Sequence, residues 1–108
     1  MEKKKAVLYC RVAGVENPST GDALLAQRAR LTAYAEKKGM EITGIYMDAG
    51  FSGRTLDRPG LQSVLEAVKD GTADTILVVN HSRLFRGLLP EELRGLPIRS
   101  VNEPNLER

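Results

Sequence analysis

The side chains of this sequence best suited to chemistry are four arginines, Arg11, Arg58, Arg83 and Arg86. The first follows the apolar run 6–10, the last two follow the apolar run 75–79, and the second lies in a glycine-rich loop between them. If both runs are strands of one parallel sheet, their carboxyl ends converge where open α/β folds bind ligands. Planar guanidinium groups suit phosphate, so the arginines predict an anion site.

The strands that must position these arginines are predicted from short apolar runs, at 6–10, 41–47, 75–79 and 98–101. The third run is continuous and rich in β-branched residues, as in a strand buried on both faces. Helical segments alternate with the runs, which predicts an α/β fold. We expect a mostly parallel central sheet with helices on both faces, joined by right-handed crossovers.

A first helix is predicted over about 22–38, with Asp22 as its N-cap and Gly39 as its C-terminal stop. Gln27 falls on the same face as the apolar residues Leu24, Leu31 and Tyr34. An amide on such a face needs a buried hydrogen-bond partner.

A second helix is predicted to end at Gly71, and a short one spans 90–93. The apolar repeat of the second helix at i, i+3, i+4 and i+7 consists of Leu61, Val64, Leu65 and Val68.

Composition sets the class of protein. The 108 residues, with 42% hydrophobic and 28% charged side chains, predict a single domain over 1–108. The net charge of +2 is too small to establish nucleic-acid binding by itself.

Cys10 is the one cysteine, so no internal disulfide is possible, and its apolar run predicts a buried structural thiol. No apolar run is long enough to span a membrane, and we expect a cytoplasmic protein.

Five ordered blocks of the sequence resemble the serine recombinases of the resolvase/invertase family, over roughly residues 5–101. The blocks are Tyr9-Cys10-Arg11-Val12-Ala13, Leu24 to Gln27, Asp48-Ala49-Gly50-Phe51-Ser52-Gly53, Asp57-Arg58-Pro59-Gly60-Leu61 and Ser82-Arg83-Leu84-Phe85-Arg86. The resemblance implies the catalytic domain of a site-specific DNA recombinase. In that family a serine hydroxyl attacks a backbone phosphate, forms a phosphoserine link to the 5′ end, and the break is later resealed to a new partner.

The resemblance also implies the roles of individual residues. The four arginines match the family's active-site arginines, which neutralise phosphate charge without a metal or another cofactor. Gln27 and Asp48 match positions that orient and support them. DNA is the implied partner, and the intact protein is expected to be a dimer or tetramer. This short chain is expected to associate weakly or to be monomeric.

The sequence departs from the family pattern at the nucleophile. Ala13 occupies that position, and its methyl group cannot attack a phosphate. Loss of a nucleophile costs roughly 10⁴-fold or more in rate, so the chain as written is expected not to cleave DNA. Ser82 stands where the family has an aspartate, which removes a carboxylate partner from Arg83. Whether Ala13 is engineered or natural is left open by the sequence.

Further departures concern length. The loop between Ala13 and Gln27 is a few residues longer than usual, and the helix after Arg86 is expected to be about two turns short. The chain also ends before the family's long dimerisation helix and DNA-binding domain, which suggests either an excised catalytic domain or a degenerate relative.

Several site residues have simpler interpretations. Asp48 is equally compatible with a turn, and Gly50, Gly53 and Gly60 with turns of positive φ. Phe51 is expected to anchor its loop. Ser19 is expected to form a turn or cap, and His81 to cap or pack rather than to act as a base.

Two other functions are considered beside the recombinase. One is a non-enzymatic DNA-binding or recombinase-regulating relic that keeps the phosphate pocket, with salt-dependent binding. The other is a flavodoxin-like or receiver-like domain for a small phosphorylated ligand. A glycine-rich phosphate loop after the first strand would support this ligand-binding domain, but Gly14 is the only glycine there.

Overall fold

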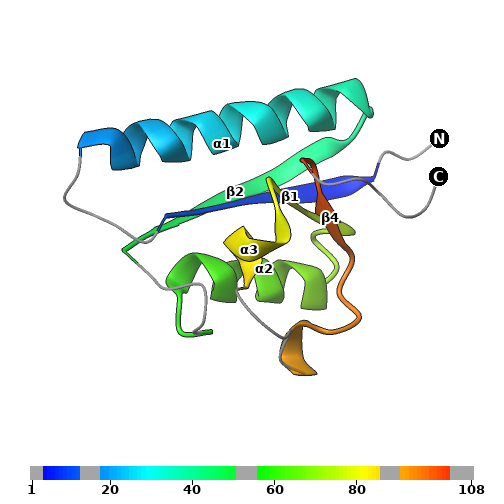
Figure 1. Ribbon diagram of the computed structural model, residues 1–108. Coiled ribbons are helices and arrows are strands. Elements are labelled where there is room, and N and C mark those ends of the chain that lie inside the picture. The colour runs from blue at the N-terminus through cyan, green and yellow to red at the C-terminus, as the bar shows by residue number, and fades with distance from the viewer. Residues whose placement is uncertain (1–3, 13–17, 51–55, 86–90, 103–108) are drawn as a thin grey trace.

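Four parallel strands form one sheet in the order β2-β1-β3-β4 in the computed structural model (Figure 1). The strands are β1 (Lys5–Val12), β2 (Glu41–Ala49), β3 (Thr75–Val78) and β4 (Ile98–Ser100). The structure describes residues 4–12, 18–50, 56–85 and 91–102, apart from the side chains at 18–21, 82 and 92. All four predicted strands are confirmed, and β1 and β2 extend two residues further toward their carboxyl ends than predicted.

Helices cover both faces of the sheet, as predicted for an α/β fold (Figure 1). Helix α1 (Pro18–Lys37) covers one face. The opposite face is covered by α2 (Pro59–Lys69), the short α3 (His81–Leu84) and the 3₁₀ helix η1 (Glu91–Leu93). The last of these matches the short helix predicted over 90–93.

Strand β1 lies at the centre of the core and is buried on both sides. Val7 and Tyr9 pack in the cluster formed with α2, whereas Leu8 and Cys10 pack in the cluster beneath α1. This alternation follows from the pleat of a strand, which directs successive side chains to opposite faces. Tyr9 and the next residue on its face, Arg11, therefore project from β1 toward α2 and α3.

The carboxyl end of β1 extends beyond its pairing with β3. Pairing with β2 continues to Val12 opposite Ala49, but pairing with β3 is present only from Ala6 to Leu8. The backbone of β1 on the β3 side needs other hydrogen-bond partners beyond that point. The site described below supplies them.

Helix α1 begins four residues before the predicted N-cap, so the assignment of Asp22 as N-cap is wrong. Pro18 is its first residue, and the fixed φ of proline suits the first helical position. Ser19, predicted to form a turn or cap, lies in the first turn of the helix.

The predicted C-terminal stop of α1 is confirmed. Gly39 has a φ of +69°. The Met40 N–H donates to the Ala35 carbonyl at 2.8 Å, and the Gly39 N–H donates to the Glu36 carbonyl at 3.2 Å. This pair of bonds is a Schellman motif, which favours glycine at the left-handed position.

Cys10 is fully buried, as predicted for a structural thiol. Burial raises its pKa to about 11, and the charge of Arg28 only partly offsets this effect. Because the thiolate is the reactive form, we expect Cys10 to be inert toward a disulfide reagent at pH 8 in the folded protein. One equivalent should react after denaturation in urea. Rapid labelling without denaturant would contradict this assignment.

Candidate active site

Two arginine side chains from different elements converge on the end of α3. The Arg11 Nε atom donates to the Arg83 carbonyl at 2.9 Å. The Arg58 Nη1 atom approaches the same carbonyl at 3.4 Å, and Nη2 donates to the Leu84 carbonyl at 2.5 Å. Arg11 is 3% exposed and Arg58 is fully buried. The sheet therefore brings together two of the predicted site arginines at the carboxyl end of β1.

The shortness of α3 explains why carbonyl oxygens are available to these arginines. A helix leaves its last four carbonyls without internal partners, and α3 contains only four residues. The C-terminal end of a helix also carries partial negative charge, which favours cations. The guanidinium groups of Arg11 and Arg58 thus satisfy carbonyls that would otherwise be buried without a donor.

The third arginine of the cluster, Arg83, lies on α3 itself. Its Nη1 atom donates to the Arg11 carbonyl at 3.3 Å, so the two arginines exchange side-chain-to-backbone bonds. The Nε atom of Arg83 is buried and has no hydrogen-bond partner within the described residues. A buried N–H without an acceptor is uncommon in proteins, and here it leaves one donor available in a cationic cluster.

Gln27 has the buried partner that its helical face requires. Its Oε1 atom accepts from the Arg11 backbone N–H at 3.2 Å, and its Nε2 atom donates to the Arg11 carbonyl at 3.1 Å. These two bonds replace the strand neighbour that β1 lacks beyond Leu8. Gln27 therefore fixes the backbone from which the Arg11 side chain extends.

Asp48 lies on β2 opposite Arg11 and binds the start of α2. Its Oδ1 atom accepts from the Gly60 N–H at 2.8 Å, and Oδ2 accepts from the Leu61 N–H at 3.0 Å. These donors belong to the first helical turn, where a carboxylate is favoured by both hydrogen bonding and the helix dipole. Asp48 is thus a strand residue that caps a helix, and the alternative of a turn-forming aspartate is wrong.

The hydroxyl of Tyr9 links Asp48 to Arg58. Tyr9 donates to Asp48 Oδ2 at 2.7 Å and accepts from Arg58 Nη1 at 3.0 Å. The Arg58 guanidinium also lies 5.8 Å from the centre of the Tyr9 ring. Burial, followed by the bond to Asp48, raises the pKa of Tyr9 above its ordinary value, while Arg58 opposes the shift. The hydroxyl therefore stays protonated at neutral pH and can serve both partners.

Arg58 reaches this network because of the residue that follows it. A residue before proline is held in an extended conformation, and Arg58 has φ of −131° and ψ of 124° immediately before Pro59. Pro59 then opens α2. The sequence Arg58-Pro59-Gly60 thus turns the arginine into the core and starts the helix that Asp48 caps.

Gly60 has a different role from the predicted one. It is the second residue of α2 and is not among the glycines of positive φ, so the turn assignment is wrong. A Cβ atom at this position would lie 2.9 Å from Asp48 Oδ2 and 3.0 Å from Oδ1. Glycine is needed because the carboxylate approaches the helix backbone closely. Gly50, by contrast, has the predicted positive φ, at +84°.

Some predicted site residues lie outside the described part of the chain, namely Ala13, Phe51, Gly53 and Arg86. Ser82 lies within α3, but its side chain is not described. His81 is the exposed first residue of α3.

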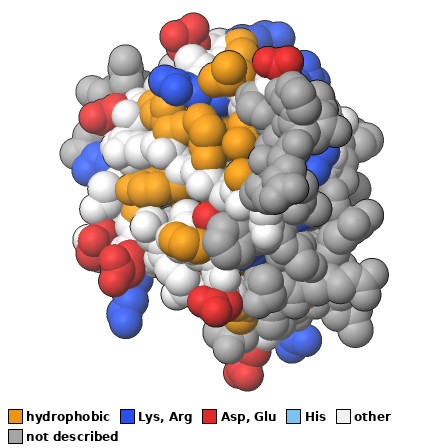
Figure 2. All heavy atoms as spheres, turned by 90° about the vertical axis from the view of Figure 1, so that its left-hand side faces the viewer, with side chains coloured by type: hydrophobic (Ala, Val, Ile, Leu, Met, Phe, Trp, Pro, Cys, Tyr) orange, Lys and Arg blue, Asp and Glu red, His pale blue; other side chains and the backbone are white. Residues whose placement is uncertain are grey.

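Figure 2 shows the end of the molecule at which β1 and β2 terminate. In the part not coloured grey, hydrophobic and uncharged atoms predominate, and lysine and arginine side chains lie toward the margins. Arg11 and Arg58 are buried and held by internal hydrogen bonds. Among the described residues, no group of three histidine, cysteine, aspartate or glutamate side chains could hold a metal ion. The helices in these segments include none long and apolar enough to cross a membrane.

Comparison with known proteins identifies the family. The model for "Resolvase, N terminal domain" matches residues 6–93. The chain belongs to the resolvase family. As a resolvase N-terminal domain, it is a serine recombinase catalytic domain by fold and sequence.

Two solved structures are similar to this resolvase domain. The N-terminal catalytic domain of TP901-1 integrase is 38% identical, with a TM-score of 0.71, over 78% of this chain and 62% of that one. The C-terminal catalytic domain of ISC1926 TnpA, an IS607-like serine recombinase, is 28% identical, with a TM-score of 0.77, over 93% and 71% of the respective chains. The resolvase domain described here therefore spans less than two thirds of the integrase domain.

A third relative is the uncharacterized immunity region protein 3 of Bacillus phage phi105. It is 31% identical over 68 residues, which are 63% of this chain and 83% of the relative.

Tyr9 is the member of the network that sequence reasoning did not select. Two signals were present. Tyr9 lies two residues before Arg11, so the two side chains share a face of the strand. A tyrosine in a fully buried strand also needs a partner for its hydroxyl.

The close approach of Asp48 to α2 predicts the effect of Gly60→Ala. Alanine normally stabilises a helix relative to glycine. Here the added methyl group must displace the carboxylate, so we expect the free energy of unfolding to fall by about 1–3 kcal/mol. Urea denaturation measures the change, and Ser63→Ala on the same helix is the control, expected to be neutral or mildly stabilising. A Gly60→Ala protein more stable than the parent would refute the contact.

Tyr9→Phe is expected to lower the free energy of unfolding by about 1–3 kcal/mol at pH 7, because Asp48 and Arg58 both lose a buried partner. The pKa of Tyr9 is raised by folding, so its contribution is fully present below about pH 10 and declines as the pH rises further. The difference between parent and variant should therefore stay constant up to about pH 10 and narrow as the pH rises above that value in urea titrations. A difference that stays constant at higher pH as well would count against a buried, protonated hydroxyl.

Proposed function

We propose that this resolvase domain binds the DNA backbone at the cluster of Arg11, Arg58 and Arg83, and that it derives from an active DNA strand-exchange enzyme. We further propose that the chain as written does not cleave DNA, because Ala13 stands at the nucleophile position. The observation that supports this most directly is the convergence of arginines at the carboxyl end of β1, immediately before position 13.

The chemistry that such a cluster favours is transfer of a phosphoryl group. A serine oxygen at position 13 would form a bond to phosphorus while the bond to the 3′ oxygen breaks, and that oxygen would leave as a hydroxyl after taking a proton. Negative charge on the other phosphate oxygens must be stabilised throughout this exchange. Fixed guanidinium groups serve that purpose because they are already oriented before the reaction begins.

Under this proposal the arginines have different tasks. Arg11 and Arg58 are deeply buried and provide a fixed positive field behind the phosphate. Arg83 is more exposed, and its buried Nε atom provides a donor that an anion can satisfy. Arg86 is proposed as a further ligand from the family pattern. Gln27 and Asp48 act as positioning residues, through the Arg11 backbone and through Tyr9 respectively.

A second candidate function is a non-enzymatic regulator of recombination that retains the phosphate pocket. The relative from the phage phi105 immunity region favours it, because the matched segment makes up 83% of that protein. The two candidates differ in one respect: only the first predicts that a serine at position 13 restores cleavage.

We propose that residues 1–108 constitute one catalytic-type domain and that an intact enzyme of this kind works as a dimer or tetramer on DNA.

Ala13→Ser tests the first candidate. The variant, fused to a sequence-specific DNA-binding domain, is incubated with duplexes that carry the matching site beside a randomised core. We expect protein–DNA adducts that survive denaturing electrophoresis, and none from the Ala13 parent. Ala13→Ser combined with Arg83→Gln should give at least about tenfold fewer adducts, because one phosphate ligand is lost. No adduct from the Ala13→Ser protein would favour the regulator instead.

Arg83→Gln tests phosphate binding without cleavage. We expect weak DNA binding by the parent that falls as salt rises, and a log–log salt slope reduced by about one in the variant. Fluorescence anisotropy with a labelled duplex at several salt concentrations measures both. Lys69→Gln removes the same charge from the far end of α2 and should leave the slope close to that of the parent. Equal slopes for parent and Arg83→Gln would exclude Arg83 as a phosphate contact.

A further inference from the structure

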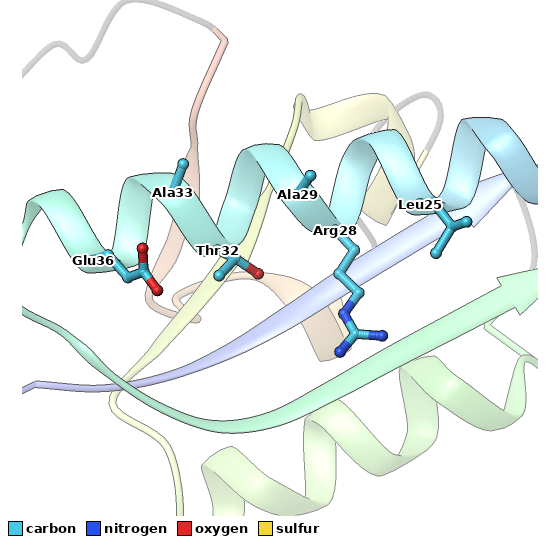
Figure 3. Close-up of a pocket in the computed structure, with 6 residues that line it drawn as sticks. All are labelled: Leu25, Arg28, Ala29, Thr32, Ala33 and Glu36. Atoms are coloured by element: carbon cyan, nitrogen blue, oxygen red, sulfur yellow. The ribbon is translucent and has the colours of Figure 1, made fainter.

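A shallow groove runs along the exposed side of α1, away from the candidate active site. Its volume is about 460 Å³, and it is lined by Leu25, Arg28, Ala29, Thr32, Ala33 and Glu36 (Figure 3). These residues recur at intervals of three and four along the helix and so form a continuous stripe. In Figure 3 the short Ala29 and Ala33 side chains lie along one edge of the stripe, and Arg28 extends from the opposite edge.

Leu25 is unusual on this stripe because of its exposure. Its side chain is 58% exposed, and no other large hydrophobic side chain in the described part of the chain is so open to solvent. The small side chains of Ala29 and Ala33 beside it would allow another helix to approach closely. The groove therefore combines an uncovered apolar side chain with room for a neighbouring backbone.

The stripe also carries two charged side chains of opposite sign. Arg28 and Glu36 are exposed, and neither side chain makes a hydrogen bond or ion pair with the residues that the structure describes. They cannot pair with each other, because eight residues along a helix correspond to about 12 Å. Arg28 lies four residues before Thr32, and Glu36 lies four residues after it.

We propose that this stripe is a contact surface for a second copy of the chain, with the two α1 helices antiparallel about a two-fold axis at Thr32. A two-fold contact requires that if one residue meets a second, the second meets the first. The spacing around Thr32 satisfies this condition. Arg28 would meet the partner's Glu36, and Glu36 would meet the partner's Arg28.

The same register covers Leu25. Counting outward from Thr32, the residue opposite Leu25 is the partner's Gly39, the C-terminal stop of α1. A Cβ atom built on Gly39 would find no other atom within 4 Å, so this position offers open space for a leucine side chain. One symmetric arrangement thus pairs both charges and buries the exposed apolar residue.

The proposed contact between the two helices is small, so we expect its affinity to be low. The paired segment from Leu25 to Gly39 is about 21 Å long, and a single helix pair of this length buries less area than the 1,200–2,000 Å² or so typical of stable complexes. We therefore expect association in the range of about 10⁻⁴ M or weaker. Such a contact becomes effective when two copies are held side by side, since effective concentrations then reach about millimolar.

Charge reversal tests the proposal. Sedimentation equilibrium of the complete 108-residue chain, up to millimolar concentration and at low salt, should show a monomer–dimer equilibrium. Arg28→Glu and Glu36→Arg should each weaken it about tenfold, because each places two like-charged pairs across the axis. The double variant R28E/E36R should recover the parent's association. Circular dichroism of each variant confirms that the fold is retained.

A mixture of the two single variants gives the sharper result. In a mixed dimer both charge pairs are again opposite, so equal amounts of Arg28→Glu and Glu36→Arg should associate at least about tenfold more strongly than either alone. Lys37→Glu mixed with Glu66→Arg provides the matched control, with the same changes in net charge at exposed positions outside the stripe. That control mixture should show no such gain.

Three outcomes would overturn the proposal. The parent chain could remain monomeric at millimolar concentration, in which case the groove is not a self-contact. Association could survive both single reversals, in which case another surface is responsible. The control mixture could gain as much as the test mixture, in which case net charge alone explains the effect. None of these outcomes bears on DNA cleavage or binding at the arginine cluster.

Discussion

Burial of the Arg58 guanidinium is the constraint on which the rest of the site depends. A cation removed from water must have its donors satisfied, and the losses are severe when they are not. Arg58 meets this need with the Tyr9 hydroxyl and two carbonyls at the end of α3. The short helix, the central strand and the start of α2 are therefore tied to one side chain.

The supports of the arginines form a connected set of hydrogen bonds rather than independent contacts. Asp48 holds the start of α2 and the Tyr9 hydroxyl, which in turn receives a bond from Arg58. Gln27 holds the backbone of Arg11 from the opposite face of the sheet. Under the proposed function, an alanine at position 13 removes the reactive oxygen, whereas the hydrogen-bonded framework of Arg11 and Arg58 is present in the structure. The proposal therefore separates loss of cleavage from retention of phosphate binding.

Particular residues show where prediction from sequence succeeded and failed. The buried partner of Gln27 was anticipated, because an amide on an apolar helix face has few alternatives. Asp22 was assigned as an N-cap because the motif is local, but Pro18 started the helix earlier. Gly60 was assigned to a turn, whereas its lack of a side chain serves a carboxylate twelve residues earlier in the sequence. Local signals cannot reveal which distant group approaches a backbone.

The sequence by itself determined the alternation of strands and helices, the α/β class and the resemblance to serine recombinases, because periodicity and ordered motifs are encoded locally. It also determined that position 13 has no hydroxyl. Only the tertiary structure decided that Arg11 and Arg58 meet at the carbonyls of α3 and that Tyr9 connects Arg58 to Asp48. These contacts join residues up to 72 positions apart. They exist because parallel pairing of strands brings their carboxyl ends to one edge, where buried polar groups must find one another.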